Sequence, residues 1–358
     1  MCHKRIAILV CASVVAVLLA GCGAGSSSSA AASNAGAPVT SKPNVTTLKL
    51  GYFPNITHSQ ALIGLMRGDF KQALGPEVNI DAKPFNAGPS VIEALFAGQL
   101  DIAYIGPNPA INGYVKSNGE ALRIISGVTS GGAALIVRSD VVINRAADLA
   151  GKKIATPQLG NTQDIALRAY LADNGLKVKE KGGEVEVIPT DNPLILDMFK
   201  QGKIDAAWVP EPWATRLIIE AGGRLFLDER DLWPNGEFVS ANIIVNTAFL
   251  KAHPEQVKAF LQAHVDITLW EQQYPDQAKA IVNAEIKRLT GKALSNDVID
   301  GAWSRQRVTY EPISTSLIKS ALAAYKAGYL KSNPDLSNIY DLSLLNQILS
   351  AKGLPEVK

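Results

Sequence analysis

The sequence predicts an α/β protein of two similar lobes, and an internal repeat carries this prediction. Residues 96–110 (FAGQLDIAYIGPNPA) return further along the chain as residues 199–214 (FKQGKIDAAWVPEPWA). Each copy is typical of a helix ending at glycine, a turn with aspartate, a short buried strand and a proline-rich turn into the next helix. Such turns are common, so chance likeness is the alternative, but agreement along the whole segment favours duplication. Because ligands bind at the carboxyl edge of parallel sheets, the repeat predicts two such edges facing a cleft.

Short apolar and β-branched runs predict strands that alternate with helices along most of the chain. Strands are expected at residues 47–53, 78–85, 102–105, 122–128, 134–138, 153–156, 185–189, 206–209, 225–227 and 243–246. Helices are expected at residues 59–67, 91–96, from 106–108 onward, 165–174, 194–200 and 210–221. Everything from Thr247 onward is expected to be helical, with helices at 254–272, 275–290, 296–305 and 314–327 forming a C-terminal cover.

The chain is predicted to pass between the lobes twice. A break at residues 129–132 (TSGG) interrupts an extended segment and is interpreted as the first crossing, and the chain returns to the first lobe before the strand at 243–246. Lobe I is therefore expected to contain residues 47–132 plus 244–358, and lobe II residues 133–243. Both lobes are expected to be Rossmann-like.

The first 21 residues are predicted to be a signal peptide rather than part of the fold. Lys4 and Arg5 precede an apolar run, residues 6–19, that is shorter than the roughly 20 residues of a membrane span. Residues 19–22 (LAGC) then resemble a bacterial lipobox, which implies cleavage of residues 1–21 and a lipid on the Cys22 thiol. An ordinary secretory signal is the alternative. Residues 22–46 would then be a lipidated flexible linker that holds the protein at the cell membrane, facing the periplasm or the extracellular side.

Charge and residue types exclude several classes of function. The formal net charge is +2, and loss of Lys4 and Arg5 with the signal leaves no basic field that would attract nucleic acid. The three cysteines all lie within the first 22 residues, so the mature chain has no disulfide. Histidines lack metal-ligand spacing, and no P-loop, dinucleotide motif or nucleophile elbow occurs. We expect a monomer without metal, cofactor or catalytic residues.

The candidate binding residues are polar or small groups in the loops that follow predicted strands. They are Asn55, Thr57, His58, Asn86, Gly88, Pro89, Gly106, Asn108, Ser130, Gly131, Gly160, Asn161, Thr162, Gln163, Glu211 and Trp213. Helix starts present free N–H groups and about half a positive charge, so several of them around a cleft would bind a small anion without a cluster of basic residues. The alternative is that these side chains only cap their helices.

Three of these residues have competing interpretations. Glu211 would cap its helix, pair with Arg216 or face a cationic group of the ligand. Trp213 would cover an apolar part of the ligand or pack in the core. His58 is expected to form loop hydrogen bonds rather than act as a base.

Four segments resemble substrate-binding proteins of ABC importers: residues 51–64, 85–111, 151–171 and 202–214. The resemblance is to the branch that includes binders of aliphatic sulfonates, taurine, nitrate and thiamine-pyrimidine precursors. It implies a bilobal type II periplasmic-binding-protein fold with a two-strand hinge, closure of the lobes on the ligand, and delivery to a membrane permease driven by a separate ATPase. It places ligand loops at 54–58, 86–90, 106–108, 160–163 and 211–213. Residues 157–164 (PQLGNTQD) depart from the Ser/Thr-rich loop of many sulfonate binders.

The expected function is capture of a small anionic solute, with an aliphatic sulfonate or taurine as the first choice. Nitrate and a thiamine-pyrimidine precursor are alternative ligands for the same class of receptor. An enzyme on the same scaffold and the sensor domain of a regulator are alternatives from other classes, but the chain offers neither a nucleophile with its base nor a DNA-binding segment.

Overall fold

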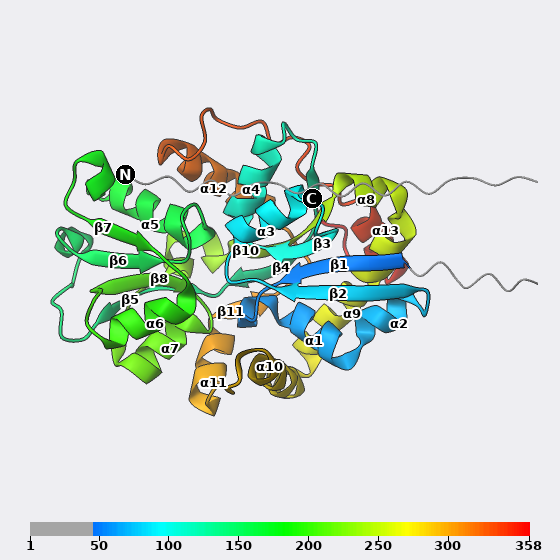
Figure 1. The fold of residues 1–358 in the computed structure, drawn as a ribbon, viewed down its shortest axis with the longest axis horizontal. Coiled ribbons are helices and arrows are strands. Elements are labelled where there is room, and N and C mark those ends of the chain that lie inside the picture. The colour runs from blue at the N-terminus through cyan, green and yellow to red at the C-terminus, as the bar shows by residue number, and fades with distance from the viewer. Residues whose placement is uncertain (1–45) are drawn as a thin grey trace, which may run out of the picture. The chain divides into compact units, whose positions relative to one another are not determined.

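The computed structural model describes residues 46–358, which form two β-sheets with helices on both faces of each sheet (Figure 1). The expected signal peptide, Cys22 and nearly all of the expected linker lie outside the described residues. Within residues 46–358, no helix combines the length and the apolar character needed to cross a membrane.

The first sheet has six strands in the order β11-β4-β10-β3-β1-β2. These are β11 (Gln306–Val308), β4 (Leu122–Gly131), β10 (Val239–Asn246), β3 (Ile102–Ile105), β1 (Thr46–Tyr52) and β2 (Val78–Pro84). β2, β1 and β3 are parallel, and β10 runs antiparallel between β3 and β4. We call this sheet and the helices packed on it the first lobe.

The second sheet has five strands in the order β7-β6-β8-β5-β9. These are β7 (Glu186–Pro189), β6 (Lys153–Thr156), β8 (Ala206–Pro210), β5 (Ala133–Arg138) and β9 (Gly223–Asp228). β7, β6 and β8 are parallel, and β5 runs antiparallel between β8 and β9. This sheet and its helices form the second lobe, and it repeats the strand order of the first sheet without the edge strand β11.

The two lobes also repeat individual hydrogen bonds, which confirms the predicted duplication. In the first lobe the Lys49 N–H donates to Asp101 Oδ2 over 2.8 Å, and in the second the Lys153 N–H donates to Asp205 Oδ2 over 2.8 Å. The partners are 52 residues apart in both cases. The repeated Gly-x-aliphatic-Asp segment therefore has the same structural role in both copies: the aspartate fixes the start of the third strand against the first.

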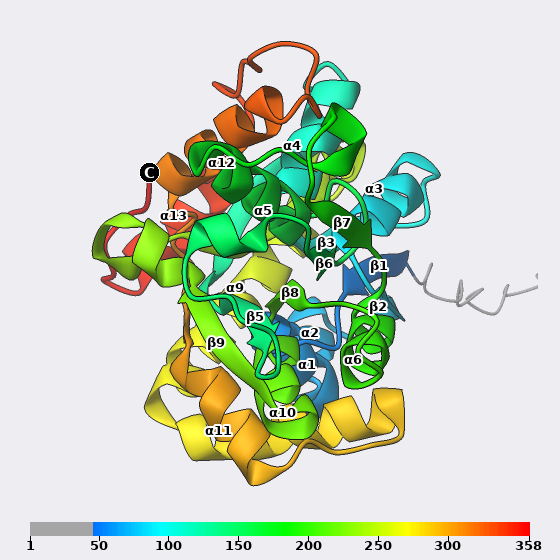
Figure 2. The same cartoon turned by 90° about the vertical axis from the view of Figure 1, so that its left-hand side faces the viewer.

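The helices sandwich each sheet. In the first lobe, α1 (Ser59–Arg67), α2 (Asp69–Leu74), α9 (Pro254–Gln273), α10 (Pro275–Thr290), α11 (Asn296–Ser304) and α13 (Ser343–Ala351) pack on one face, and α3 (Gly88–Phe96), α4 (Pro107–Lys116) and α12 (Ser314–Lys326) on the other. In the second lobe, α5 (Thr162–Asp173) covers one face and α6 (Asn192–Lys200) and α7 (Trp213–Ala221) cover the other. The short α8 (Thr247–Ala252) follows β10. α11 also contacts α7 of the second lobe, and the two helices are labelled beside each other in Figure 1. Figure 2 shows α11 from the side of the second lobe.

The chain passes between the sheets where β4 is followed by β5 and where β9 is followed by β10. Gly131 and Gly132 have φ of 79° and 75°, a left-handed conformation that suits glycine at the first passage. The predicted break at residues 129–132 was wrong in part, because β4 continues to Gly131 and pairs there with β11. β10 begins at Val239, so the chain has returned to the first sheet before residue 243, where the predicted second lobe ends. The boundaries of the two lobes stay a prediction.

The C-terminal cover is mainly helical, as expected, and it differs from the prediction at two elements. The four predicted helices correspond to α9, α10, α11 and α12. The expectation that everything after Thr247 is helical was wrong at β11, a three-residue edge strand that is too short to show a sequence period. The prediction also missed α13, whose Leu345, Ile348 and Leu349 are buried in the core of the first lobe.

Candidate binding site

Four helical segments begin at the carboxyl ends of strands without a side-chain cap. The residues at their N-cap positions are Asn55, Gly106, Asn161 and Asp191, and none of them makes a side-chain hydrogen bond to its own helix start. Ordinary capping, the alternative interpretation of these polar loops, therefore does not occupy their side chains. The first-turn N–H groups are available to a bound group. The side chains have partners elsewhere: Asn55 accepts from Trp213, Asp191 accepts from Asn86, and Asn161 donates to Gln163.

These loops surround a small cavity of about 20 Å³ between the lobes. Its lining is Phe53, Asn55, Thr57, His58, Asn86, Gly106, Asn161, Thr162, Gln163, Asn192, Pro210 and Ser240. Eight of these are predicted site residues: Asn55, Thr57, His58, Asn86, Gly106, Asn161, Thr162 and Gln163. No Lys, Arg, Asp or Glu lines it, so the site is built from neutral hydrogen-bonding groups, as expected. A volume of this size holds about one water-sized group.

Hydrogen bonds from one lobe to the other close the space around this cavity. Trp213 Nε1 of the second lobe donates to Asn55 Oδ1 of the first over 3.0 Å. At the rim, Asn86 Nδ2 donates to Asp191 Oδ2 over 3.1 Å. Gly106 permits a close approach of the two lobes, because a Cβ atom there would lie 2.3 Å from Thr162 Oγ1. The structure is therefore a closed arrangement of the two lobes.

Two side chains in the lining have polar atoms without a hydrogen-bond partner. Thr162 Oγ1 and Asn192 Oδ1 are both buried, and neither atom has a partner within residues 46–358. A buried polar group without a partner costs free energy, so each of these atoms favours a ligand that would satisfy it. Asn192 was missed from the sequence, although it follows β7 as Asn86 follows β2 and the same rule would have found it.

His58 is a neutral hydrogen-bonding group, as predicted. The Phe53 N–H donates to its Nδ1 over 3.2 Å, which leaves the ring proton on Nε2. Its ring stacks on Phe53 with centroids 4.4 Å apart, and burial lowers the pKa of His58 to about 3. His58 therefore adds a donor to the lining and no positive charge at neutral pH.

Ligand affinity is therefore expected to stay constant between pH 5 and 8. The lining contains no other titratable side chain, and His58 is neutral throughout this range because its pKa is about 3. Calorimetric titration at several pH values with a ligand whose own charge does not change measures this. A loss of affinity centred near pH 6.5 would show that His58 titrates normally and would contradict the assignment.

Eight predicted residues lie outside the cavity lining. They are Gly88, Pro89, Asn108, Ser130, Gly131, Gly160, Glu211 and Trp213. The Asn108 side chain donates to the Ser320 carbonyl of α12 over 3.1 Å, and the Gly160 N–H donates to Asp164 Oδ2 over 2.9 Å. Ser130 lies at the passage from β4 to β5. These residues shape the loops and the passage between lobes rather than the surface of the cavity.

Glu211 caps its helix and does not face the cavity. Its side chain is fully buried, and it accepts hydrogen bonds from the Thr215 N–H over 3.1 Å and from Arg305 over 3.3 Å. Burial raises the pKa of Glu211, while Thr215 and Arg305 stabilise its charged form. The predicted partner, Arg216, instead lies over the Trp213 ring, with its guanidinium carbon 4.6 Å from the ring centre. Of the three interpretations of Glu211, capping is the one that the geometry fits.

No group of three or more His, Cys, Asp or Glu side chains within residues 46–358 is placed to hold a metal ion. The site offers the hydrogen bonding described above, together with the dipoles of the helix starts.

A model of the NMT1-like family matches residues 41–286, which is more than half of the chain. The chain belongs to the NMT1-like family.

Relatives of this member of the NMT1-like family are named as binding proteins. A taurine-binding periplasmic protein of Escherichia coli (strain K12) is 28% identical over 188 residues, covering 52% of this chain and 56% of the relative. The chain thus spans little more than half the length of that relative. A putative aliphatic sulfonates-binding protein of Bacillus subtilis (strain 168) is 24% identical over 342 residues, covering 94% of each chain.

Solved structures show the same fold. The alkanesulfonate-binding protein SsuA from Xanthomonas axonopodis pv. citri, bound to MOPS, has a TM-score of 0.69 at 20% identity, covering 84% of this chain and 99% of that one. The periplasmic nitrate-binding protein NrtA from Synechocystis PCC 6803 has a TM-score of 0.71 at 17% identity, covering 88% and 91%. The predicted α/β fold of the periplasmic binding proteins is confirmed by these neighbours.

Proposed function

We propose that this NMT1-like protein is the extracytoplasmic solute-binding component of an ABC importer, and that it captures an aliphatic sulfonate or taurine. The observation that carries the proposal is the cavity between the lobes, whose lining is neutral and polar and comes from the carboxyl ends of strands in both sheets. Relatives named for taurine and aliphatic sulfonates support the same class of ligand.

The anion would be held by dipoles rather than by a basic side chain. Each uncapped helix start favours an anion by about 0.3–1 kcal/mol at an exposed site and up to about 2 kcal/mol when partly buried. Several such starts meet here in a site closed from water, where electrostatic interactions are stronger. A sulfonate oxygen would accept from the Thr162 hydroxyl, which has no partner among residues 46–358.

Asn192 favours a ligand that also carries a donor. Its Oδ1 is a buried acceptor without a partner, and a plain sulfonate offers no hydrogen to it. The ammonium group of taurine offers three. This difference favours taurine over ethanesulfonate, which has the same number of carbon atoms and lacks the amine.

Calorimetric titration with taurine and ethanesulfonate tests the proposal. We expect 1:1 binding, and we expect Asn192→Ala to weaken taurine binding about tenfold or more, as loss of a hydrogen bond to a charged group does. Asn144→Ala, an exposed asparagine of the second lobe, is the matched control and should leave the affinity unchanged. Absence of binding to any sulfonate, with a correctly folded protein, would overturn the ligand assignment.

Nitrate is the second candidate ligand because of the size of the cavity. A volume of about 20 Å³ holds about one water-sized group, so taurine would require the lobes to lie further apart than they do here, whereas nitrate would require less opening. The same titration with nitrate separates the two: binding of nitrate alone would keep the receptor class and change the solute. An enzymatic role has less support: His58 and the hydroxyl groups of Thr57 and Ser240 share the lining, but His58 Nδ1 accepts from the Phe53 N–H, and among residues 46–358 no hydrogen bond joins its ring to a hydroxyl group.

The remaining parts of the proposal concern where the protein acts. Cleavage after residue 21, a lipid on Cys22 and a flexible linker to residue 46 would hold the receptor at the outer face of the cell membrane. Lobe closure would then present the ligand-bound form to a permease and its ATPase. Mass spectrometry of the mature protein from its native membrane tests the lipid directly, because acyl chains add a defined mass to Cys22.

A further inference from the structure

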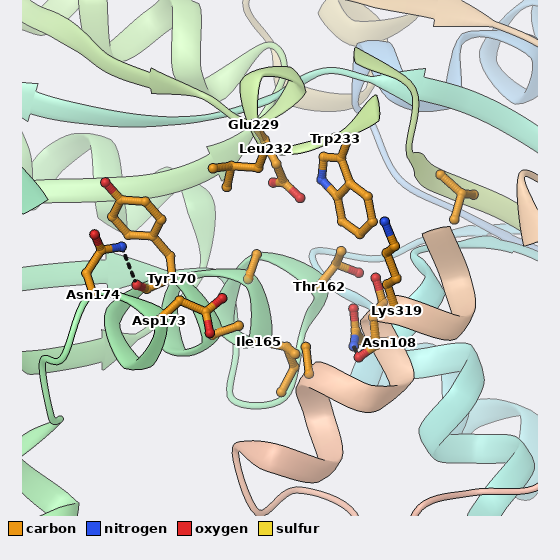
Figure 3. Close-up of a pocket in the computed structure, with 15 residues that line it drawn as sticks. Asn108, Thr162, Ile165, Tyr170, Asp173, Asn174, Glu229, Leu232, Trp233 and Lys319 are labelled. Atoms are coloured by element: carbon orange, nitrogen blue, oxygen red, sulfur yellow. Dashed lines mark hydrogen bonds between the residues drawn. The ribbon is translucent and has the colours of Figure 1, made fainter. Parts of the chain in front are cut away.

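A second and larger cavity lies on the far side of the contact between Gly106 and Thr162. Its volume is about 470 Å³, within the range of small-molecule sites. Its walls come from α5 and the turn η4 (Glu229–Leu232) of the second lobe and from α4 and α12 of the first lobe, as Figure 3 shows. Thr162 alone lines both cavities, so the two are separate spaces.

One end of this cavity has a cation and neutral hydrogen-bonding groups. Lys319 of α12 lies there beside Thr162 and Asn108 (Figure 3). The Lys319 ammonium group lies 5.8 Å from the centre of the Trp233 ring and forms no ion pair with a carboxylate of residues 46–358. Thr162 Oγ1 is buried and has no hydrogen-bond partner in the described part of the chain. This end therefore suits an acidic group.

A buried carboxylate without a basic partner faces the same cavity from the other wall. Glu229 is only 3% exposed, its Oε2 accepts from Trp208 Nε1 over 2.8 Å, and no Lys or Arg among residues 46–358 forms an ion pair with it. Burial raises the pKa of Glu229 to about 7, against the opposing effect of the indoles of Trp208 and Trp233. A cation in the cavity would remove the cost of this buried charge. Asp173 adds a second carboxylate at the end opposite Lys319 (Figure 3).

The surface between these charges is apolar or aromatic. Ile165 forms one side, Leu232 and the Trp233 ring lie opposite, and the Tyr170 ring closes the end near Asp173 (Figure 3). The Lys319 ammonium group at one end and the carboxyl groups of Glu229 and Asp173 toward the other therefore flank an apolar channel. An occupant that matches all three features has an acidic group, an aliphatic chain and an amine.

We propose that this cavity is a second ligand site, for an elongate organic zwitterion whose acidic group lies by Lys319 and Thr162 and whose ammonium group lies toward Glu229. It is a separate space from the first cavity, although Thr162 lines both. Because its walls belong to both lobes, a molecule bound here favours one relative arrangement of them, so binding at the two sites is coupled.

Calorimetry with 6-aminohexanoate tests the proposal, with hexanoate and hexylamine as matched probes that carry the same chain and one charge each. We expect 6-aminohexanoate to bind about tenfold or more tightly than either probe, since each charge contributes a charge-assisted contact. Equal affinities, or no binding of 6-aminohexanoate, would overturn the proposal.

Variants locate the bound probe. Lys319→Ala and Glu229→Gln should each weaken 6-aminohexanoate binding about tenfold, whereas Lys326→Ala on the same helix should not. Asn192→Ala alters only the first cavity, so it should leave the affinity for 6-aminohexanoate unchanged. Failure of the sulfonate proposal is therefore distinguishable from failure of the second-site proposal. Binding that responds to Asn192→Ala and not to Lys319→Ala would place the probe in the first cavity and overturn the second site. Lys319 is exposed, so its variant keeps the test valid even if Glu229→Gln does not fold.

Discussion

Gly106→Ala is expected to weaken ligand binding roughly ten- to hundredfold while leaving the fold intact, because overpacking of this kind costs about 1–3 kcal/mol. The added Cβ would lie 2.3 Å from Thr162 Oγ1 on the opposite lobe, so it opposes closure specifically. Gly106 has φ of −70° and ψ of 159°, which alanine adopts without strain. The loss of a glycine N-cap and the reduced entropy of the unfolded chain are small and of opposite sign, so the free energy of unfolding should change by less than about 1 kcal/mol.

Titration with taurine measures the loss of affinity, and small-angle scattering of the free protein reports closure without any ligand. The double variant Gly106→Ala/Thr162→Ala is the control. With the Thr162 hydroxyl removed, the clash is relieved, and the alanine at position 106 should have little further effect beyond that of Thr162→Ala alone. Additive effects of the two substitutions would mean that steric contact between the lobes is not the cause.

The fold was predictable because its signals are local. The aspartates of the repeat, Asp101 and Asp205, mark the same turn in each lobe, and the apolar strands that follow them pair with the first strands in equivalent register. Helix starts after strands were also visible as Pro, Asn and Gly in short loops. Each of these features is set within about a dozen residues, where periodicity and turn chemistry are informative.

The site was less predictable because contacts with residues distant in the sequence decide which polar side chains line the cavity. Asn108 was a reasonable candidate, but its amide is used by Ser320, 212 residues away. Ser240 lines the cavity from within β10, an antiparallel strand, so the rule about loops after strands does not apply to it. Glu211 is held by Arg305, which comes from the end of α11. No local pattern indicates which polar loop residue a later helix will occupy.

Glu271→Gln is expected to make the protein more stable at pH 8 and to have little effect at pH 4. Glu271 of α9 is 1% exposed; Ser59 Oγ donates to its Oε1 over 2.6 Å, and Oε2 has no partner within residues 46–358. Burial raises the pKa of Glu271 to about 8. Because this pKa is raised in the folded state, the protonated carboxyl costs nothing at low pH, and stability falls as pH rises from the unfolded pKa near 4.3 toward 8.

The size of this change in stability follows from the difference between the folded and the unfolded pKa of Glu271. Each unit by which the folded pKa exceeds the unfolded one corresponds to about 1.4 kcal/mol, so the difference between variant and parent should grow to roughly 4 kcal/mol by pH 8. Denaturant unfolding of both proteins at pH 4, 5, 6, 7 and 8 measures it. The buried His58 and His264 have lowered pKa values of about 3 and about 4, so they destabilise the fold as pH falls below 6.5.

The difference between the two proteins isolates Glu271, because the histidines and Glu229 are present in both and their contributions cancel. Glu285→Gln is the matched control: this glutamate is also buried, at 2% exposure, but its Oε1 is 2.7 Å from Arg288. Removing the charge of an ion-paired carboxylate leaves Arg288 without its partner, so the free energy of unfolding of this variant should not rise at pH 8. Parallel stability curves for Glu271→Gln and the parent would show that Glu271 is ionised in the folded protein, and the buried network around Ser59 would then need a cation that the described residues do not place there.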